Sequence, residues 1–319
     1  MNPSVVVVGS FIQDLAFFTR DFPRPGETVV GDFRAGPGGK GFNQAVAATR
    51  AGAKTLFIGA VGSDAFGAGA HKFARAAGVQ AHFVDKKKEA TGAAVVSIDA
   101  HGQNQIIVSL GANLALHKRD VPVPPLRTAA VVVCQGESDF RTVAHVLRTA
   151  RATGAVTVLN PAPMRADFDP ALLKHTEVLI PNETEFVTLA NQLPRSSGGR
   201  NLTPEALLRM PADRLHTLCR SFGVPVVIVT LGAQGCFVSE PGVYVRIHAH
   251  EVEAVDATGA GDAFVGGFAA GLVRFKRNVF EAAHFATAVA ALAVTLPGTA
   301  TAMPTAREIT RFLKKRDHA

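Results

Sequence analysis

The residues best placed to do chemistry lie in one stretch, Asp256-Ala257-Thr258-Gly259-Ala260-Gly261-Asp262-Ala263-Phe264-Val265-Gly266-Gly267-Phe268. The preceding segment Val243–Val255 is partly alternating and reads as a strand, whereas Phe264, Phe268 and Leu272 have helical spacing. The small residues 259–261 are therefore expected where a strand gives way to a helix. The first N–H groups of a helix have no partner within it and carry the positive end of its dipole, so an anion could bind there.

Asp262 adds a carboxylate in the first turn of this expected helix. A carboxylate repels a phosphate, so a useful reason to place one beside an anion site is to take a proton from an attacking hydroxyl. An ordinary N-terminal turn with a helix-favouring aspartate would show the same local pattern. The stretch alone leaves both interpretations open.

Composition limits the class of protein. The chain has 319 residues, 47% of them hydrophobic, which suits one large α/β domain or one with a small appendage. We find no apolar run long enough to cross a bilayer and no signal-peptide pattern, and three widely spaced cysteines suggest neither metal nor disulfide framework. We expect a cytoplasmic protein with no membrane partner.

The net charge of +7 suits anionic ligands. Nucleic acid also fits a basic chain, but this one has no Trp, a single Tyr and scattered basic residues. The composition therefore favours a nucleotide user and argues against a nucleic-acid partner.

A glycine-rich segment, residues 36–44, leads into a helix expected at Ala45–Ala51. It is not a Walker A loop, because Lys40 is followed by Gly41 rather than by Ser or Thr. A loop with four glycines in six residues is costly in chain entropy, so we interpret it as a turn that contacts a ligand. Asp14 follows the buried strand Ser4–Gly9, beyond whose carboxyl end ligands of open α/β sheets bind, so Asp14 is placed to contact one. A plain turn aspartate would look the same at this position.

The second half alternates between strands and helices, and polar residues follow each strand. Strands are expected at Val131–Cys134, Val156–Leu159, Val178–Ile180 and Val226–Val229. The pattern predicts a mostly parallel sheet with one site along its carboxyl edge. There Asn182 and Glu185 could hold a hydrated Mg²⁺, and the turn from Thr230 to Gly235 could contact nucleotide phosphates. Each could equally be a helix cap or surface group.

Two further segments are expected outside this sheet. Thr28–Ala35 and the hairpin-like Thr91–Val108 could form a small separate sheet, and Arg195–Arg200 reads as an exposed loop. Because the chain has no Gly-x-Ser-x-Gly elbow and no Gly-x-Gly-x-x-Gly after the first strand, hydrolase and dehydrogenase activities are disfavoured. Phosphoryl transfer to a small hydroxyl compound remains.

From Val5 to about Pro304 the chain resembles the PfkB/ribokinase family of sugar kinases. The motifs that carry the resemblance are Phe22-Pro23-x-Pro25-Gly26-Glu27-Thr28, Gly38-Gly39-Lys40-Gly41-x-Asn43-Gln44, Gly111-Ala112-Asn113, Gln135-x-Glu137, Asn160-Pro161-Ala162-Pro163, Pro181-Asn182-Glu183-Thr184-Glu185, Thr230-Leu231-Gly232-x-x-Gly235 and Ala254-Val255-Asp256-x-Thr258-Gly259-Ala260-Gly261-Asp262. The resemblance implies a three-layer α/β/α fold, one kinase domain over 1–319, and lid strands near 28–35 and 91–108.

The resemblance also implies roles for individual residues in transfer of the ATP γ-phosphate to the 5-hydroxyl of D-ribose. Asp262 would be the catalytic base and Gly259, Ala260 and Gly261 the anion hole. The sugar would bind Asp14, Gly39, Lys40, Gly41, Asn43 and Glu137. MgATP would bind Asn182, Thr230, Leu231, Gly232, Gly235, Gly261 and Thr287, with Glu185 reaching Mg²⁺ through water. The lid would also form a homodimer contact.

A K⁺ site beside the anion hole is implied as well, from Asp256, Thr258, Ala293, Leu296 and Gly298. Ala302 stands where a serine hydroxyl often completes that site, so a weaker site is expected. Ile12 stands where some relatives have a sugar-contacting Asn, and Phe42 replaces the usual Ala. Deoxyribose, another pentose, a ketohexose or a nucleoside therefore stay open as substrates, as does a non-catalytic sugar- or nucleotide-binding regulator.

Overall fold

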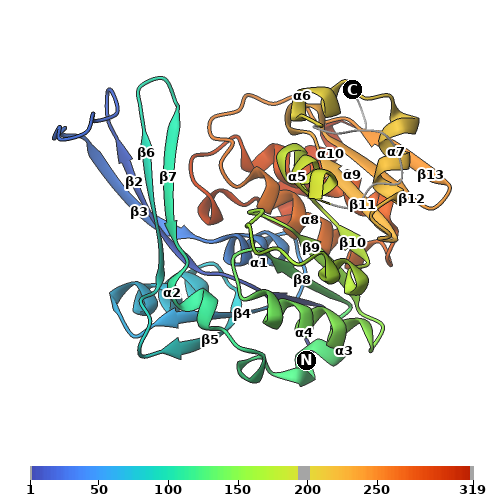
Figure 1. The fold of residues 1–319 in the computed structure, drawn as a ribbon, viewed down its shortest axis with the longest axis horizontal. Helices are drawn as coiled ribbons and strands as arrows, with labels where there is room; N and C mark the ends of the chain where they lie inside the picture. Colours follow the sequence, from blue (N-terminus) through green and yellow to red (C-terminus); the bar gives the residue numbers. More distant parts are fainter. Residues whose placement is uncertain (1, 193–201, 317–319) are drawn as a thin grey trace.

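A computed structural model describes residues 2–192 and 202–316 and shows a central nine-stranded sheet (Figure 1). The strand order is β13-β12-β11-β10-β9-β8-β1-β4-β5, parallel except for β12 and β13 at one edge. The strands span β1 Val5–Val8, β4 Thr55–Gly62, β5 Gln80–Lys86, β8 Val131–Gln135, β9 Val156–Asn160, β10 Val178–Leu179, β11 Val226–Thr230, β12 Cys236–Glu240 and β13 Val243–Ile247. The predicted parallel sheet is confirmed, and β5 and β12 are additions to it.

Helices cover both faces, because the central strands are apolar on both sides. In β1, Val5 and Val7 face one core, and Val6 and Val8 face the other. The first core is covered by α1 Lys40–Arg50, α2 Ala65–Ala76, α8 Ala260–Arg274, α9 Val279–Ala293 and α10 Ala306–Arg316. The second is covered by α3 Val123–Thr128, α4 Phe140–Arg151, α5 Glu183–Gln192, α6 Pro204–Leu208 and α7 Ala212–Arg220. The predicted three layers are present.

A second sheet of four strands projects from this body, and we call it the lid (Figure 1). Its order is β3-β2-β6-β7, with β2 at Ile12–Phe18, β3 at Asp32–Gly38, β6 at Gly92–Ile98 and β7 at Asn104–Ser109. The prediction of a lid strand over 28–35 was misplaced, since residues 28–31 lie outside β3. The alternative interpretation of Asp14 as a turn residue was wrong, because Asp14 lies within β2 and pairs with residues of β3 and β6.

Two local expectations around the site need correction. The predicted strand Val243–Val255 stops at Ile247, and an irregular segment, 248–259, leads into α8. The helix expected from Ala45 begins at Lys40, so Lys40, Gly41 and Asn43 belong to a helix rather than to a loop.

Helix α8 packs closely between α1 and α9 because glycines line its contacts. A Cβ on Gly266 would lie 2.4 Å from the Gln44 carbonyl oxygen, and one on Gly271 would lie 2.8 Å from Ala282 Cα. These positions require residues without a side chain. The close approach brings the first turn of α8 beside the first turns of α1.

Three smaller predictions can be compared with the model. The three cysteines are buried and free of disulfides. Within the described ranges, every helix is too short or too polar to cross a membrane. The exposed loop expected at 195–200 lies outside the described residues, and the cytoplasmic setting stays a prediction.

Candidate active site

The first turn of α8 presents a carboxylate held by two amides of α1. Asp262 is 7% exposed, and its Oδ2 accepts a hydrogen bond from Asn43 Nδ2 at 2.9 Å. Its Oδ1 accepts one from Gln44 Nε2, also at 2.9 Å. Gly259 precedes the helix with φ 80°, a left-handed conformation that glycine adopts without strain. The predicted anion loop and carboxylate thus lie together at one helix N-terminus.

A second buried carboxylate explains why α1 begins early. Glu137 Oε2 accepts hydrogen bonds from the Lys40 backbone N–H at 2.8 Å and from Ser10 Oγ at 2.5 Å. A negative charge at a helix N-terminus satisfies an unpaired N–H and interacts well with the dipole. Gly39 turns the chain with φ 88°, and its Cβ would lie 2.7 Å from Ile12 N. Glycine at this position therefore allows the backbone before α1 to lie close to the backbone at Ile12.

The cation of Lys40 lies within the field of three carboxylates. Burial by itself would lower the pKa of Lys40, but the charges of Asp262, Glu137 and Glu185 outweigh burial and raise it. Burial raises the pKa of Glu137, against the opposing effect of Lys40. Charged Lys40 therefore links groups from three different elements.

Asp14 belongs to the same electrostatic cluster, although it comes from the lid. Burial, with the nearby charges of Glu137 and Asp262, raises the pKa of Asp14 to about 7. Gly38 leaves room for this carboxyl group, since a Cβ there would lie 2.1 Å from Asp14 Oδ2. The lid thus contributes a side chain to the site of the main body.

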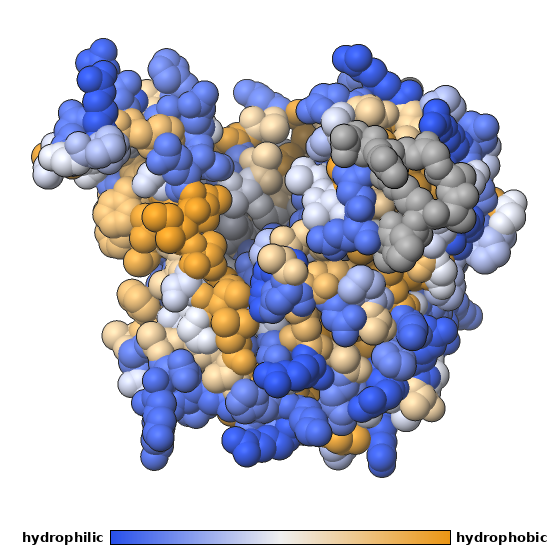
Figure 2. All heavy atoms as spheres, viewed as in Figure 1, coloured by the Kyte–Doolittle hydropathy of each residue, from blue (hydrophilic) through white to orange (hydrophobic). Residues whose placement is uncertain are grey.

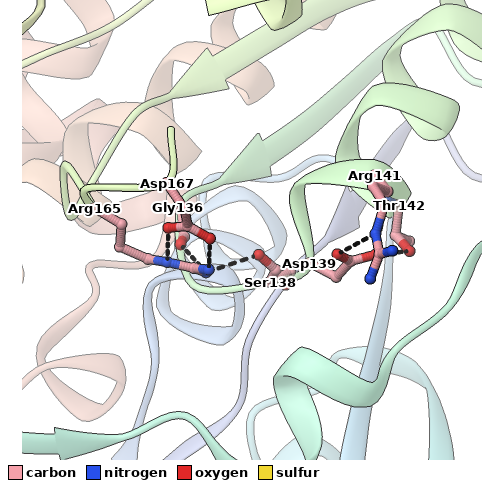
Figure 3. A network of polar contacts seen from close by, with 7 residues as sticks. All are labelled: Gly136, Ser138, Asp139, Arg141, Thr142, Arg165 and Asp167. Atoms are coloured by element: carbon pink, nitrogen blue, oxygen red, sulfur yellow. Dashed lines mark hydrogen bonds and ion pairs between the residues drawn. The ribbon is translucent and has the colours of Figure 1, made fainter. Parts of the chain in front are cut away.

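The loop that carries Glu137 is fixed from outside by Arg165 (Figure 3). Arg165 Nη1 donates to the carbonyl oxygens of Gly136 and Ser138 at 3.1 and 3.0 Å, one on each side of Glu137. Asp167 pairs with the same guanidinium, whose Cζ lies 4.6 Å from the centre of the Phe140 ring. These contacts hold the backbone so that Glu137 points toward α1.

A cavity of about 160 Å³ opens next to Asp262 and receives the ends of several strands. Its lining includes Lys40, Asn160, Ala162, Ile180, Asn182, Glu185, Thr230, Ala257, Gly259, Ala260, Gly261, Asp262 and Val265. A Cβ on Gly261 would meet no atom within 4 Å. The cavity therefore lies along the carboxyl edge of the sheet, where one site was expected.

Asn182 and Glu185 cap α5 and also line this cavity. Asn182 Oδ1 accepts from the Glu185 N–H at 2.8 Å, and Glu185 Oε2 accepts from the Asn182 N–H at 2.9 Å. This reciprocal arrangement is a capping box. The pair caps a helix, and it could also hold Mg²⁺, because the second carboxylate oxygen of Glu185 has no hydrogen-bond partner in the described ranges. One carboxylate oxygen facing a polar cavity suits a hydrated Mg²⁺.

The remaining residues predicted for the nucleotide come from the turn after β11 and from α9. Thr230, Leu231, Gly232 and Gly235 form the turn between β11 and β12, where a Cβ on Gly235 would lie 2.1 Å from the Ile247 carbonyl oxygen. Thr287 is buried in α9, and its hydroxyl donates to the His284 carbonyl at 2.7 Å. Of these five residues, only Thr230 lines the cavity.

The residues expected to hold K⁺ come from two segments that the structure brings together. Asp256 Oδ1 accepts from the Thr258 N–H, and its Oδ2 accepts from the Gly298 N–H, both at 2.9 Å. Ala293 accepts from the Leu296 N–H. A carboxylate and backbone carbonyls are suitable donors for such a cation. Ala302, which is buried nearby, has no side-chain oxygen to add.

Phe42, which was expected to bear on substrate choice or to point into the core, is fully buried, with its ring 5.2 Å from that of Phe11, so it is a core residue. Other residues of the site carried no predicted role. Ser10 and Gln44 contact the carboxylates directly, and Thr299 Oγ1 donates to the Pro37 carbonyl at 3.1 Å. Gln44 belongs to the recognised motif Gly38–Gln44, but nothing in its position along the chain indicated that it would hydrogen-bond to Asp262.

Comparison with known proteins identifies the relatives of this chain. The family model described as "pfkB family carbohydrate kinase" matches residues 2–306. A ribokinase from Haemophilus influenzae is 34% identical over 98% of this chain and 99% of its own length. A deoxyribokinase from Salmonella typhimurium is 31% identical over 97% and 98%. The Arabidopsis thaliana ribokinase complexed with ribose and ATP superposes with a TM-score of 0.83, at 30% identity over 98% and 99%.

Proposed function

Because this chain belongs to the pfkB family of carbohydrate kinases, we propose that it transfers the γ-phosphate of ATP to the 5-hydroxyl of D-ribose. The observation that carries the proposal is Asp262, a buried carboxylate beside the open anion loop of α8. Support for the substrates comes from the ribokinase relative and from the relative whose structure contains ribose and ATP. The whole chain would act as one catalytic domain.

The proposed reaction uses these side chains in sequence. Asp262 takes the proton as the sugar hydroxyl oxygen bonds to the γ-phosphorus, and the bond to the ADP oxygen breaks. The N–H groups at Gly259, Ala260 and Gly261 stabilise the charge on the transferred group. Lys40 neutralises charge between the two substrates. The remaining sugar hydroxyls would bind the side chains of Asp14, Lys40, Asn43 and Glu137 and the backbone at Gly39 and Gly41.

For the nucleotide we retain the predicted set and add no geometry. Asn182, Thr230, Leu231, Gly232, Gly235, Gly261 and Thr287 would contact ATP. Glu185 would hold Mg²⁺ through water, and that ion would neutralise phosphate charge. Asp256, Thr258, Ala293, Leu296 and Gly298 would hold K⁺, which would support the anion loop because Asp256 bonds the adjacent Thr258 N–H.

Deoxyribose is the second candidate substrate. A deoxyribokinase is among the relatives, and Ile12 offers a buried apolar side chain where a polar one would favour an additional hydroxyl. An apolar residue near the sugar would discriminate less against a missing hydroxyl. Ribose remains our proposal because its 2-hydroxyl can use the other polar groups of the site.

The first experiment measures ADP release from MgATP with a panel of pentoses, hexoses and nucleosides, with and without K⁺. We expect the highest kcat/KM with ribose and an increase on adding K⁺. A preference for deoxyribose or another acceptor would support kinase activity but would contradict ribose as the substrate. Binding of sugar or ATP without turnover of any acceptor would favour a non-catalytic regulator.

The pH dependence of sugar use should depend on Asp14. Since the pKa of Asp14 is raised to about 7, its carboxyl group is neutral below that pH and charged above it. A charged carboxylate accepts stronger hydrogen bonds from hydroxyls, so KM for the sugar should fall as pH rises from about 6 to 8. Asp14→Asn should remove the inflection from the plot of KM against pH, because the amide has nearly the shape of the carboxyl group but does not titrate. Persistence of the inflection in that variant would show that another group titrates.

We also propose that the chain forms a homodimer through the lid. Strand pairing places Asp14, Ala94 and Val108 on the face toward the active site. The opposite face carries Phe17, Phe33, Val95 and Ile107, which are 40%, 54%, 39% and 75% exposed. Figure 2 shows apolar side chains gathered over the lid strands. A second copy of the same face would cover them symmetrically.

Sedimentation analysis tests the dimer. Ile107→Asp should shift the protein to a monomer, because a charge would be buried in the contact. Val243→Asp is the matched control, since Val243 is 40% exposed on the distant edge strand β13 and should leave assembly unchanged. A wild-type protein that sediments as a monomer would contradict the proposal.

A further inference from the structure

Behind Asp262 lies a chain of side-chain amides that sequence analysis did not connect. Gln135 Nε2 donates to Gln44 Oε1 at 2.7 Å. Gln44 Nε2 donates both to Asp262 Oδ1 at 2.9 Å and to Asn160 Oδ1 at 3.0 Å. Asn160 Nδ2 donates to the Ile180 carbonyl at 2.8 Å. Gln44 is fully buried, and Gln135 and Asn160 are 1% and 7% exposed.

The direction of this chain is determined at its far end. The carbonyl of Ile180 can only accept, so Asn160 must turn its Nδ2 toward it and its Oδ1 toward Gln44. Gln44 must then present its NH₂ group to Asn160, and the same group faces Asp262. Reversing the Gln44 amide would place its oxygen against two other oxygens. Its remaining oxygen accepts from Gln135, which supports the same orientation.

This arrangement distinguishes the two oxygens of Asp262. Oδ1 accepts from Gln44, a fully buried residue with fixed orientation. Oδ2 accepts from Asn43, whose own Oδ1 is buried and has no hydrogen-bond partner in the described part of the chain. A buried acceptor without a partner is costly, and a substrate hydroxyl could satisfy it. Oδ2 is thus the oxygen beside a polar group that awaits a ligand.

We propose that Gln44 is a positioning residue that holds Asp262 Oδ1, so that Oδ2 receives the proton of the attacking hydroxyl. The inference rests on the proposed kinase function and extends it to a residue that does not touch the substrate. The geometry depends on tertiary contact, since a Cβ on Gly266 would lie 2.4 Å from the Gln44 carbonyl oxygen and would prevent α8 from approaching so closely. Asn43 donates to Oδ2, the oxygen that would receive the proton, while Gln44 holds Oδ1.

The test uses Gln44→Met, which keeps the approximate length and removes both the oxygen and the NH₂ group of the side-chain amide. We expect kcat to fall about 10- to 100-fold, the range found when a supporting hydrogen bond is lost. KM for sugar and ATP should stay within about twofold, because Gln44 binds neither. In an Asp262→Ala background, Gln44→Met should cause no further loss, since its effect passes through Asp262.

A structural control separates positioning from simple loss of a buried polar contact. Thr157 is fully buried, and its hydroxyl donates to the His175 carbonyl at 2.7 Å. Thr157→Val should lower the melting temperature while kcat is retained. If Gln44→Met does not fold, Gln135→Met is the second variant: it removes the donor to Gln44 Oε1, loosens the hold on the Gln44 amide and should lower kcat by about 3- to 10-fold.

The outcomes distinguish this inference from the proposed function. Normal kcat in Gln44→Met, or in Gln135→Met if that variant is used, combined with an inactive Asp262→Ala would overturn the positioning role and leave the kinase mechanism intact. Normal turnover in Asp262→Ala would overturn the mechanism itself. A rise in KM with unchanged kcat in Gln44→Met would also contradict the inference, because it would indicate substrate binding.

Discussion

Asp262→Ala is expected to lower turnover by roughly two to four orders of magnitude, the usual range for loss of a general base. The carboxylate lies at the first turn of α8 beside Gly261, where the cavity is open. Removing it leaves the N–H groups of the anion loop in place, so ATP should still bind. Turnover with ribose and MgATP, together with equilibrium binding of ATP, would measure both effects.

Alanine is a better replacement here than asparagine. Both Asp262 oxygens accept hydrogen bonds from side-chain amides, so an asparagine NH₂ group would face another donor and disturb the site. The matched control is Asp213→Ala, which removes an aspartate from the first turn of α7. If Asp262 only favoured the start of its helix, the two substitutions would have similar effects on turnover. Near-normal activity in Asp262→Ala would therefore contradict the catalytic role.

The second large effect is expected for Lys40→Met. Its cation interacts with Asp262, Glu137 and Glu185, and its removal leaves these carboxylates without their shared counter-charge. Breaking a buried charge interaction commonly costs about 3–5 kcal/mol, which, if expressed fully in catalysis, corresponds to roughly a 10²- to 10⁴-fold loss in kcat/KM. We expect the loss with respect to both sugar and ATP, because the carboxylates belong to both halves of the site.

Lys86 offers a control for loss of a buried cation elsewhere. Its Nζ lies 2.6 Å from Asp120 Oδ2, and the two side chains are 15% and 16% exposed. Lys86→Met should lower the melting temperature without a comparable loss of kcat/KM. Unchanged kinetic constants in Lys40→Met would refute its placement between the substrates, whereas equal losses in both variants would indicate a general effect of destabilisation.

The sequence by itself determined most of the central sheet and the place of the candidate site residues at its carboxyl edge. Buried runs such as Val5–Val8 and Val131–Cys134 are apolar at every position, which requires a strand covered on both faces. The small residues at 259–261 followed by Asp262 predict an open helix N-terminus from local stereochemistry alone. Parallel strands end at one edge, so polar residues after several strands had to gather there.

Other features were missed because distant residues determine them. Helix α1 begins at Lys40 because Glu137, almost one hundred positions later, binds the Lys40 N–H, whereas the glycines before it argue locally for a loop. Strand β2 is held by pairing with residues 32–38 and 92–98, so Asp14 could not be assigned to the lid from its neighbours. The irregular segment before α8 likewise reflects contacts with Val294 rather than its own alternating pattern.

The amide chain behind Asp262 shows the same division most clearly. The sequence places Asn43 and Gln44 in one motif and Asp262 in another, but no local property predicts which amide contacts which oxygen. That choice depends on the Ile180 carbonyl, on Asn160 at the end of β9, and on the absence of a side chain at Gly266. Hydrogen-bond direction is a property of groups brought together by packing, so only the tertiary structure could decide it.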